Sequence, residues 1–275
     1  MSKIPLAGVI GCPVAHSRSP VLHGTWLRQY GLKGHYVPLH VEKDDLPQVL
    51  RALPQMGFVG VNVTIPHKEA ALALADIVSP MARAIGAANT LTFEDGLIHA
   101  DNTDGYGFLQ NLREGAQDWQ PTNGPALVLG AGGAARAVIV ALADAGVPHI
   151  WLSNRTRTRA ETLQAEISAP ITLIDWADWT QAAQDAALII NTTSLGMAGQ
   201  PALDLADRLF NPGSVVTDLV YTPLETEFLR QAQKSGCVTV DGLGMLLHQA
   251  APGFERWFGH KPEVTEALRA AVLGK

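Results

Sequence analysis

A lysine at the start of an expected helix is the first candidate for chemistry. The segment Gly60-Val61-Asn62-Val63-Thr64-Ile65-Pro66-His67-Lys68 is typical of a strand that runs into a helix, with Pro66 suited to the first helical position. Strand alternation places Asn62 and Thr64 on one face, near the carboxyl end where open α/β sheets bind ligands. The helix dipole disfavours a cation such as Lys68 in the first turn of a helix. A residue that is locally unfavourable, at a position where ligands are expected to bind, indicates a functional role. We therefore predict that Lys68 gives and takes a proton; the alternative is an ordinary surface lysine.

A carboxylate is the expected partner of this lysine. Asp104 stands in Asp101-Asn102-Thr103-Asp104-Gly105, just before an expected helix at 105–113, so the alternative role for Asp104 is an N-cap. At a separation of about 4 Å the Lys68 and Asp104 charges would attract by on the order of 4 kcal/mol at an effective dielectric of 20, before desolvation is subtracted. That attraction would orient the ammonium group, and we predict the two residues as a catalytic pair.

Two hydroxyls at another helix start suggest how an acidic substrate could be held. Ser17 and Ser19 flank Arg18 and precede Pro20, where Ser19 fits an N-cap. A helix N-terminus with two nearby hydroxyls is also suited to a carboxylate. Near the other end of the chain, Met245 and Gln249 are four residues apart and share a helix face. We expect this face to border substrate and cofactor, although a core role suits Met245 equally well.

A glycine-rich turn predicts a dinucleotide site. The run Gly130-Ala131-Gly132-Gly133-Ala134-Ala135 follows an apolar strand directly and opens a run suited to a helix. It fits G-x-G-x-x-G/A, in which glycines permit a tight turn, close approach of backbone to pyrophosphate and close helix packing. The alternative is a glycine turn that merely joins a strand to a helix.

The residues after the next strand predict which dinucleotide binds. An NAD-specific protein usually has Asp or Glu there, whereas this chain has Asn154-Arg155-Thr156-Arg157-Thr158-Arg159. A carboxylate would repel a 2′-phosphate, and guanidinium groups bind it through charge-assisted hydrogen bonds. We therefore predict NADP(H), with Arg155, Thr156 and Arg159 as phosphate ligands and Arg157 turned outward. The alternative is a solvated basic helix start, which the helix dipole opposes unless an anion compensates.

Composition and charge exclude several classes of protein. With 47% hydrophobic and 17% charged residues, the chain is too apolar for a disordered protein and too evenly interrupted by charge for a membrane span. The net charge of -6 gives no overall attraction to nucleic acid or to an anionic membrane surface. Cys12 and Cys237 form no CxxC pair, and the nine histidines show no H-E-x-x-H spacing. We expect a cytoplasmic protein that binds neither nucleic acid nor membrane, with no disulfide framework and no metal.

Alternating β-rich and helical runs predict an α/β fold with two domains, since 275 residues at roughly 150 per domain allow about two. The first part is expected to hold strands near 5–10, 35–41 and 58–65, helices near 20–30, 44–55 and 67–75, and a hairpin that turns at Glu94-Asp95-Gly96. That combination makes a mixed sheet. The second part is expected to hold strands near 126–129, 149–153, 171–174, 187–191, 214–219 and 237–240.

The predicted organisation is an N-terminal mixed α/β sheet domain and a Rossmann-type, doubly wound parallel sheet domain with a cleft between them. A polar, proline-bounded stretch at 117–125 is typical of a linker, and no strand follows the last expected helices, which should return to the first domain. We assign 1–104 plus 243–275 to a substrate-binding and catalytic domain. The range 105–242 is assigned to an NADP-binding domain.

Taken together, these segments resemble the shikimate dehydrogenase family, whose members are NADP-dependent. The resemblance spans nearly the whole chain in order. It is carried by Ser17-Arg18-Ser19-Pro20, Val63-Thr64-Ile65-Pro66-His67-Lys68, Ala88-Asn89-Thr90, Asp101-Asn102-Thr103-Asp104-Gly105, Gly130-Ala131-Gly132-Gly133-Ala134, Asn154-Arg155-Thr156, Asn191-Thr192-Thr193-Ser194-Leu195-Gly196-Met197, Asp218-Leu219-Val220-Tyr221-Thr222-Pro223 and Asp241-Gly242-Leu243-Gly244-Met245.

The resemblance implies NADPH-dependent, reversible reduction of the C3 ketone of 3-dehydroshikimate to shikimate, a step in aromatic amino acid biosynthesis. It implies Lys68 and Asp104 as the catalytic pair. The implied substrate ligands are Ser17, Ser19, Asn62, Thr64, Asn89, Tyr221 and Gln249. The implied cofactor residues are Gly130, Ala131, Gly132, Gly133, Ala134, Asn154, Arg155, Thr156, Arg159, Thr192, Thr193, Ser194, Gly242 and Met245. The roles of Asn89, Tyr221 and 192–194 rest on the resemblance alone.

Three alternatives remain open. A broader quinate/shikimate dehydrogenase is the nearest, although the arginines favour NADP. A non-catalytic NADP-sensing protein on the same fold is disfavoured by the presence of both Lys68 and Asp104. A folate-linked or amino-acid dehydrogenase of similar plan lacks support from the Ser17/Ser19 and Asn62/Thr64 groups. The expected partner is a small-molecule substrate, and the chain is expected to be a monomer or a homodimer.

Overall fold

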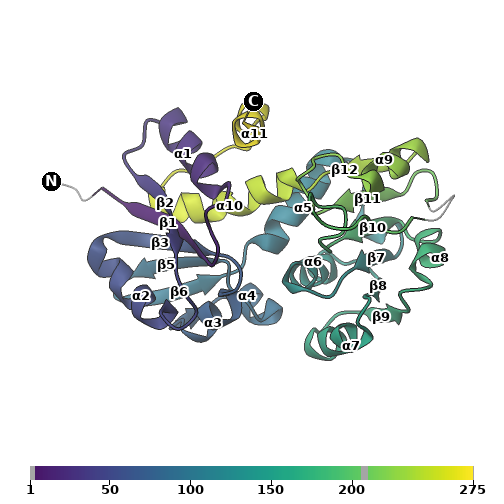
Figure 1. Ribbon diagram of the computed structural model, residues 1–275, viewed down its shortest axis with the longest axis horizontal. Coiled ribbons are helices and arrows are strands. Elements are labelled where there is room, and N and C mark those ends of the chain that lie inside the picture. The colour runs from purple at the N-terminus through teal and green to yellow at the C-terminus, as the bar shows by residue number, and fades with distance from the viewer. Residues whose placement is uncertain (1–3, 206–209, 275) are drawn as a thin grey trace. The chain divides into compact units, whose positions relative to one another are not determined.

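The computed structural model describes residues 4–205 and 210–274, which form two compact units, each with its own six-stranded sheet (Figure 1). Unit 1 comprises Met1–Thr103 and Leu247–Lys275, and unit 2 comprises Asp104–Leu246. The C-terminal residues thus cluster with the N-terminal unit. The functions assigned to the two predicted ranges remain predictions. Among the described residues, every helix is too short or too polar to cross a lipid bilayer.

Unit 1 is built on a mixed sheet with the strand order β2-β1-β3-β5-β6-β4. β1 pairs in parallel with β2 and β3, whereas β5 is antiparallel to both β3 and β6. The short edge strand β4 is parallel to β6. The strands are β1 (Leu6–Gly11), β2 (His35–His40), β3 (Phe58–Val63), β4 (Ile77–Val78), β5 (Thr90–Glu94) and β6 (Leu97–Asp101).

The turn between β5 and β6 confirms the predicted hairpin. Asp95 and Gly96 both have positive φ, 51° and 79°, as a two-residue type I′ turn requires. The helices of unit 1 are α1 (Ser19–Gln29), α2 (Leu46–Ala52), α3 (Lys68–Ala73), α4 (Pro80–Ile85), α11 (Glu266–Leu273) and the part of α10 (Leu243–Phe258) from Leu247 onward. The predicted helix at 44–55 is instead α2 followed by the 3₁₀ turn η1 (Leu53–Met56).

Unit 2 is a wholly parallel sheet with the order β12-β11-β10-β7-β8-β9. The chain runs outward from β7 to β9 and then crosses back to β10, so the topological switch point lies between β7 and β10. The strands are β7 (Ala126–Leu129), β8 (Ile150–Ser153), β9 (Ile171–Ile174), β10 (Leu188–Asn191), β11 (Val215–Asp218) and β12 (Val238–Val240). The predicted α/β class, with one mixed and one doubly wound sheet, is confirmed.

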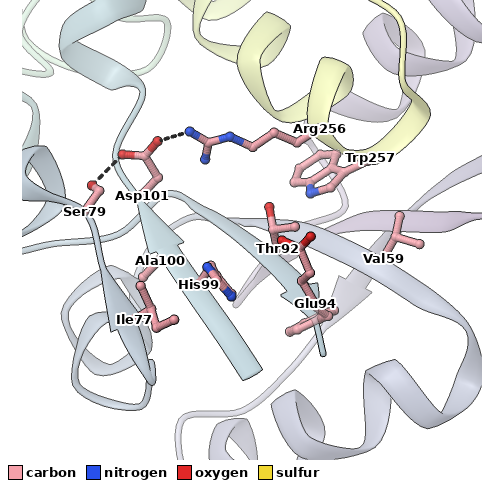
Figure 2. A pocket seen from close by; sticks show the side chains of 11 residues that line it. Val59, Ile77, Ser79, Thr92, Glu94, His99, Ala100, Asp101, Arg256 and Trp257 are labelled. Atoms are coloured by element: carbon pink, nitrogen blue, oxygen red, sulfur yellow. Dashed lines mark hydrogen bonds and ion pairs between the residues drawn. The ribbon is translucent and has the colours of Figure 1, made fainter. Parts of the chain in front are cut away.

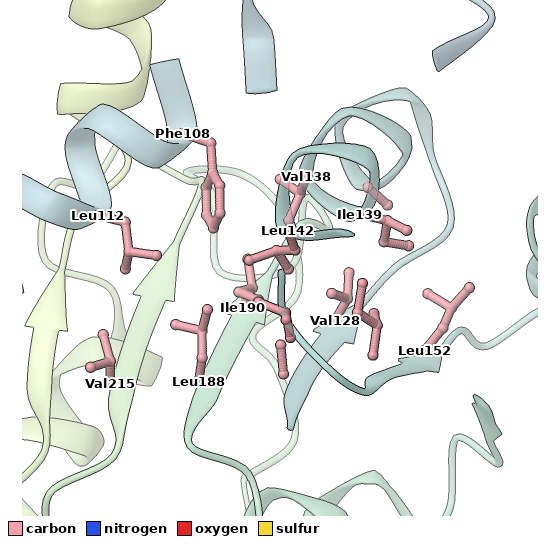
Figure 3. Close-up of a cluster of buried hydrophobic side chains, with 14 of the residues drawn as sticks. Phe108, Leu112, Val128, Val138, Ile139, Leu142, Leu152, Leu188, Ile190 and Val215 are labelled. Atoms are coloured by element: carbon pink, nitrogen blue, oxygen red, sulfur yellow. The ribbon is translucent and has the colours of Figure 1, made fainter. Parts of the chain in front are cut away.

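Helices cover both faces of this second sheet, and strand alternation distributes the core between them. Val128, Leu188 and Ile190 pack with residues of α5 and α6 such as Phe108 and Leu142 (Figure 3). The alternate strand residues pack against α8 and α9 on the other face. Burial on both faces explains why these strands are continuous apolar runs. The elements around the sheet are α5 (Asp104–Gly115), η2 (Pro121–Asn123), α6 (Gly133–Asp144), α7 (Arg157–Glu166), α8 (Trp179–Ala183) and α9 (Glu227–Lys234).

Three helix starts differ from the expected positions. The N-cap residue of α1 is Arg18, while Ser19 is already helical, so Ser19 is not an N-cap. Pro66 is not the first helical residue, because α3 begins at Lys68 after a turn in which the His67 N–H donates to the Thr64 carbonyl (3.0 Å). Asp104 is the first residue of α5 and does not precede it. Lys68 nevertheless stands in the first turn of its helix.

Gly60 in β3 offers a test of unit 1 packing. A Cβ there would overlap the Trp257 indole nitrogen and the Leu91 carbonyl oxygen, which are joined by a buried hydrogen bond of 3.1 Å. Because overpacking and loss of this bond both destabilise, we expect Gly60→Ala to lower the free energy of unfolding by about 3 kcal/mol in urea denaturation. The control is Gly24→Ala in α1, whose methyl would meet only the flexible end of Arg28. It should be neutral or stabilising by up to about 1 kcal/mol; equal losses in both variants would contradict this account.

Candidate functional site

Lys68 is held by backbone contacts on both sides. The adjacent His67 is buried, and its Nε2 lies 2.8 Å from the carbonyl oxygen of Val41, the residue just after β2. The Lys68 carbonyl accepts from the Ala88 N–H at 3.0 Å. These contacts fix the start of α3 against the segment that carries Asn89. The half-buried Lys68 side chain is thereby presented from a rigid frame.

Asn89 joins three of the predicted substrate ligands. Its Nδ2 donates to Gln249 Oε1 (3.2 Å), and its carbonyl accepts from Asn62 Nδ2 (3.2 Å). Its Oδ1 accepts from the Thr103 N–H (2.8 Å) and from Thr90 Oγ1 (2.9 Å). Asn62, Asn89 and Gln249, which are far apart in sequence, therefore belong to one hydrogen-bonded network in unit 1.

The network continues towards the two predicted serines through a residue that the sequence analysis missed. Tyr36 is buried and donates to Asn62 Oδ1 at 2.7 Å, and its hydroxyl also bonds with Ser19. Burial raises the pKa of Tyr36 well above its ordinary value, so the hydroxyl stays protonated. The Ser19 N–H in turn donates to Ser17 Oγ at 3.3 Å. The structure thus connects Ser17 and Ser19 to the asparagine network.

His23 supports Tyr36 from one side. Their rings stack with centroids 3.9 Å apart and an interplanar angle of 3°. Burial lowers the pKa of His23 to about 3, so the ring is neutral near pH 7. A neutral stacked ring restrains the plane of the Tyr36 ring without adding a charge.

Thr64 completes the predicted set in unit 1. It lies just beyond the end of β3, and its N–H still donates to the Ile10 carbonyl at 2.9 Å. Its methyl group packs so closely on Gly11 that a Cβ at Gly11 would stand 2.6 Å from it. Thr64 therefore occupies a fixed position beside the turn that leads to Lys68.

A separate pocket of about 600 Å³ lies elsewhere in unit 1 (Figure 2). Asp101 accepts from Ser79 Oγ at 2.6 Å and pairs with Arg256 at 2.7 Å. Among the described residues that line the pocket there is no predicted substrate ligand. Since Asp101 and Arg256 compensate each other, we do not assign this pocket to the substrate.

The glycine-rich turn of unit 2 has the form that a pyrophosphate requires. Gly130 has φ of 108°, and a Cβ there would stand 2.7 Å from Thr192 Oγ1, so glycine is needed at this position. Around Gly132 and Gly133 there is open space within 4 Å of where a Cβ would stand. The twelve-residue helix α6 begins at Gly133 with no side-chain cap at Gly132. Its N–H groups are therefore open to an anion.

Asn154 fastens this turn to the arginine segment. Its Oδ1 accepts from the Ala131 N–H (3.1 Å), and its Nδ2 donates to the Thr156 carbonyl (2.7 Å). The glycine-rich turn follows β7 and the arginine segment follows β8, so both lie at the carboxyl ends of adjacent strands. Asn154 is thus a link between the expected pyrophosphate site and the expected 2′-phosphate site.

The three arginines of this segment are not equivalent. Arg157 forms ion pairs with Glu161 (3.3 Å) and with Asp175. The Arg155 and Arg159 guanidinium groups are exposed and make no ion pair or hydrogen bond with any side chain that the structure describes. Their charges are therefore available to an anion, whereas the charge of Arg157 is already compensated.

The remaining cofactor candidates also lie in unit 2, most of them at strand ends. Thr192 Oγ1 donates to the Leu129 carbonyl (2.7 Å), and Thr193 Oγ1 donates to Asn191 Oδ1 (2.7 Å). These bonds shape the turn through the exposed Ser194, next to the topological switch point. Met245 packs partly against the core of unit 2, so a core role is part of its function.

Backbone packing within unit 2 requires a glycine at position 242, independently of any cofactor. A Cβ there would stand 2.7 Å from the Asp218 carbonyl oxygen and still closer to the Leu219 carbonyl.

Asp104 and Tyr221 are both half-buried residues of unit 2. Lys68 belongs to unit 1 and Asp104 to unit 2, so their pairing stays a prediction.

The residues present fit a dinucleotide that carries a 2′-phosphate. The open backbone at Gly132 and Gly133 matches a pyrophosphate, and the uncompensated Arg155 and Arg159 match a further phosphate. These features meet at the carboxyl ends of the strands beside the switch point, where doubly wound sheets bind nucleotides.

Family models match three consecutive parts of the chain. The shikimate dehydrogenase substrate binding domain matches residues 9–91, the shikimate / quinate 5-dehydrogenase model matches 116–198, and the shikimate 5'-dehydrogenase C-terminal domain matches 242–273. A protein of Roseobacter denitrificans named shikimate dehydrogenase (NADP(+)) is 62% identical over 100% of this chain and 99% of its own length. The chain belongs to the shikimate dehydrogenase family.

Solved structures extend the likeness. Shikimate 5-dehydrogenase from Thermus thermophilus, in complex with NADP(H) and shikimate, is 40% identical with a TM-score of 0.87 and 99% of each chain covered. Quinate dehydrogenase from Corynebacterium glutamicum, in complex with NAD, is 31% identical with a TM-score of 0.91, covering 98% of this chain and 99% of that one. The resemblance stated from the sequence is thus confirmed for the family and for the fold.

This member of the shikimate dehydrogenase family also has a buried carboxylate that the sequence analysis did not single out. Asp218 accepts from Asn191 Nδ2 (2.9 Å) and the Val220 N–H (3.0 Å) through Oδ1, and from Thr226 Oγ1 (2.7 Å) through Oδ2. It therefore joins the ends of β10 and β11 to the N-cap of α9. The signal in the sequence was a lone Asp at the end of an apolar strand.

Burial raises the pKa of Asp218 from 3.8 to about 6, despite its three donors. The folded state then holds this proton more tightly than the unfolded chain, so the contribution of Asp218 to stability is greatest below about pH 4 and falls as the pH rises to about 6. A shift of about 2 units corresponds to about 3 kcal/mol. We expect Asp218→Asn to remove this fall in the free energy of unfolding with rising pH, which urea denaturation between about pH 4 and pH 7 would measure.

The control for this experiment is Asp185→Asn, at an exposed position of unit 2. It should follow the pH profile of the wild type. A parallel profile for Asp218→Asn and the wild type would show that Asp218 is not the group responsible.

Proposed function

We propose that this chain catalyses the reversible, NADPH-dependent reduction of 3-dehydroshikimate to shikimate, a step of the shikimate pathway toward aromatic amino acids. The observation that carries the proposal is the end-to-end similarity to relatives named shikimate dehydrogenase (NADP(+)). The uncompensated Arg155 and Arg159 support the same cofactor on independent, electrostatic grounds.

Unit 1 supplies the groups for an acidic, hydroxylated substrate. Ser17 and Ser19 offer hydroxyls to the substrate carboxylate, while Asn62, Thr64, Asn89 and Gln249 offer amide and hydroxyl groups to the ring hydroxyls. The network through Tyr36 and Asn89 holds these groups in fixed directions before substrate binds. Preorganised polar groups avoid the cost of ordering them during the reaction. Tyr221 of unit 2 is assigned to the substrate on the resemblance.

Lys68 and Asp104 carry the proton chemistry. When bound, NADPH supplies the hydride for the substrate ketone. The Lys68 ammonium stabilises the alkoxide that develops on the carbonyl oxygen and gives it a proton, and the Asp104 carboxylate orients that ammonium. In the reverse direction the same amine accepts the hydroxyl proton of shikimate.

The cofactor is held by the strand ends of unit 2. The Gly130–Ala134 turn and the start of α6 receive the pyrophosphate, and Arg155, Thr156 and Arg159 receive the 2′-phosphate. Asn154 keeps these two sites in register through its bonds to Ala131 and Thr156. Thr192, Thr193 and Ser194 line the groove, and Gly242 and Met245 lie by the nicotinamide.

A dual quinate/shikimate activity is the second candidate, favoured by the shikimate / quinate model over residues 116–198. NADPH consumption with 3-dehydroshikimate, run beside NADH and dehydroquinate, separates the two. Turnover only with 3-dehydroshikimate and NADPH supports the first candidate, and comparable turnover of dehydroquinate supports the second. Turnover of neither ketone would overturn both candidates.

The proposal also places the enzyme in the cytoplasm, as a monomer or a homodimer. Light scattering would distinguish the monomer from the homodimer.

Lys68→Ala tests the proton-transfer role. We expect kcat to fall at least about 100-fold with a modest change in KM, because positioned acid-base groups typically contribute about 10² to 10⁴ in rate. Steady-state kinetics with NADPH and 3-dehydroshikimate measure this. Lys33→Ala, at an exposed site between α1 and β2 of unit 1, is the control and should keep wild-type kcat. Near-normal turnover of Lys68→Ala would remove Lys68 from the mechanism.

The arginines give a matched test of cofactor choice. We expect the double variant Arg155→Gln, Arg159→Gln to raise KM for NADPH at least about tenfold while leaving KM for NADH nearly unchanged, since only NADPH has the 2′-phosphate. Arg157→Gln is the control, because its charge is already compensated by Glu161 and Asp175. If the double variant weakened both cofactors equally, Arg155 and Arg159 would not be phosphate ligands.

A further inference from the structure

Three side chains of different chemistry meet beside the first two strands of unit 1. Cys12 directly follows β1, His40 is the last residue of β2, and Glu42 lies two residues further on. β1 and β2 are parallel neighbours in which Gly11 pairs with His40, so the carboxyl ends of both strands coincide. A thiol, an imidazole and a carboxylate are thereby brought together, and none of the three belongs to the proposed substrate or cofactor residues.

The separations between these donor atoms match the edges of a tetrahedral zinc site. Cys12 Sγ lies 3.7 Å from His40 Nε2 and 3.4 Å from Glu42 Oε2, and His40 Nε2 lies 3.1 Å from Glu42 Oε1. Zinc bonds of about 2.3 Å to sulfur, about 2.0 Å to nitrogen and about 2.0 Å to oxygen at tetrahedral angles give edges of about 3.5 Å from sulfur to nitrogen, about 3.5 Å from sulfur to oxygen and about 3.3 Å from nitrogen to oxygen. The two short contacts of Glu42 are made by different oxygens, Oε2 towards sulfur and Oε1 towards nitrogen. With one ligand atom taken from each residue, the three atoms lie within 4.8 Å of one another, so an ion could bind them after a rotation of the exposed Glu42 carboxylate.

We propose that Cys12 Sγ, His40 Nε2 and a Glu42 carboxylate oxygen form a binding site for one zinc ion. Sulfur and imidazole ligands favour zinc and its transition-metal neighbours over Mg²⁺ or Ca²⁺, which prefer oxygen. His40 and Glu42 are more than half exposed, so the fourth position of the ion is open to water or to an incoming ligand.

The backbone around the three ligands is held in place without metal. The Val41 N–H donates to the Gly11 carbonyl (3.3 Å), and the Cys12 N–H donates to the Ile65 carbonyl (3.1 Å). The buried His67 ring contacts the Val41 carbonyl, between the two ligands His40 and Glu42. Since both strand ends are fixed, the ligands are presented together and the ordering cost of binding is small.

Metal binding at this site is a proton exchange. On binding, the sulfur–hydrogen bond gives way to a sulfur–zinc bond and the proton leaves to solvent. The thiolate and carboxylate charges then balance the two charges of the ion.

Sequence spacing did not indicate this site, and the expectation from the sequence was that the protein binds no metal. Cys12 is 28 residues from His40, which fits no local zinc motif. The ligands meet only because parallel pairing of β1 and β2 aligns their ends.

Cobalt(II) is the probe for the test, because tetrahedral cobalt with a thiolate ligand has strong visible bands and a near-ultraviolet charge-transfer band. Chelator-treated protein without an affinity tag should bind one equivalent of cobalt with both features, and zinc should bleach them. Cys12→Ser and His40→Gln should each lose the tetrahedral spectrum, and Glu42→Gln should weaken cobalt binding at least tenfold. Cys237→Ser and His35→Gln, the latter at the opposite end of β2, are matched controls that should keep it.

A measurement on the wild type does not depend on how the variants fold. Zinc should slow alkylation of Cys12 by iodoacetamide at least tenfold, as followed by peptide mass spectrometry. A weak octahedral cobalt spectrum, a charge-transfer band that survives Cys12→Ser, or unchanged alkylation of Cys12 with zinc would each overturn the proposal.

Discussion

A buried amide must find hydrogen-bond partners for both its oxygen and its nitrogen, and in unit 1 this requirement is met at Asn89. Its Oδ1 receives the Thr103 N–H and the Thr90 hydroxyl, and its Nδ2 reaches Gln249. These contacts join three parts of unit 1 to the Asn89 side chain: the start of β5, the chain just after β6, and helix α10. The directions of the proposed substrate ligands depend on that satisfied network, because leaving one buried partner unpaired costs about 1–3 kcal/mol.

Asparagines have the same role at the strand ends of unit 2. Asn154 ties the glycine-rich turn to the segment of Thr156, and Asn191 ties the Thr193 turn to the buried Asp218. An asparagine can accept from one loop and donate to another, which suits it to joining two strand ends. The loops that are proposed to bind a ligand are thereby fixed by amides, while the Arg155 and Arg159 guanidinium groups form no ion pair with any residue that the structure describes.

Much of the fold was predictable because strands and helices alternate with clear periodicity. The parallel sheet of unit 2 follows from apolar runs such as Ala126–Leu129, and the hairpin follows from Asp95-Gly96. Helix starts were less predictable. Ser19 and Pro66 both carry local start signals, yet α1 begins at Ser19 itself and α3 begins two residues after Pro66. Tertiary bonds of the flanking turns overrode those local preferences.

The site was predictable where chemistry is local and not where it depends on strand pairing. The glycines and arginines of unit 2 stand in short motifs, so their chemistry could be read from neighbours in sequence. Tyr36 could not be found in this way, since only the arrangement of β1, β2 and β3 brings it to Asn62. The meeting of Cys12 with His40 was hidden for the same reason.

The arginine segment shows how a binding preference can be present before any ligand is bound. Arg157, Thr158 and Arg159 open α7, where the N-terminal dipole disfavours positive charge by about 0.3–1 kcal/mol for each cation. Arg157 escapes this cost because Glu161 and Asp175 compensate it. Arg159, and Arg155 just before the helix, have no such compensation from the described residues, so the unliganded protein retains an unrelieved repulsion at this point. A dianionic phosphate removes that repulsion and gains charge-assisted hydrogen bonds, whereas a ribose hydroxyl does neither. If Arg155 and Arg159 hold the 2′-phosphate as proposed, relief of this repulsion adds to the contacts that favour NADP(H).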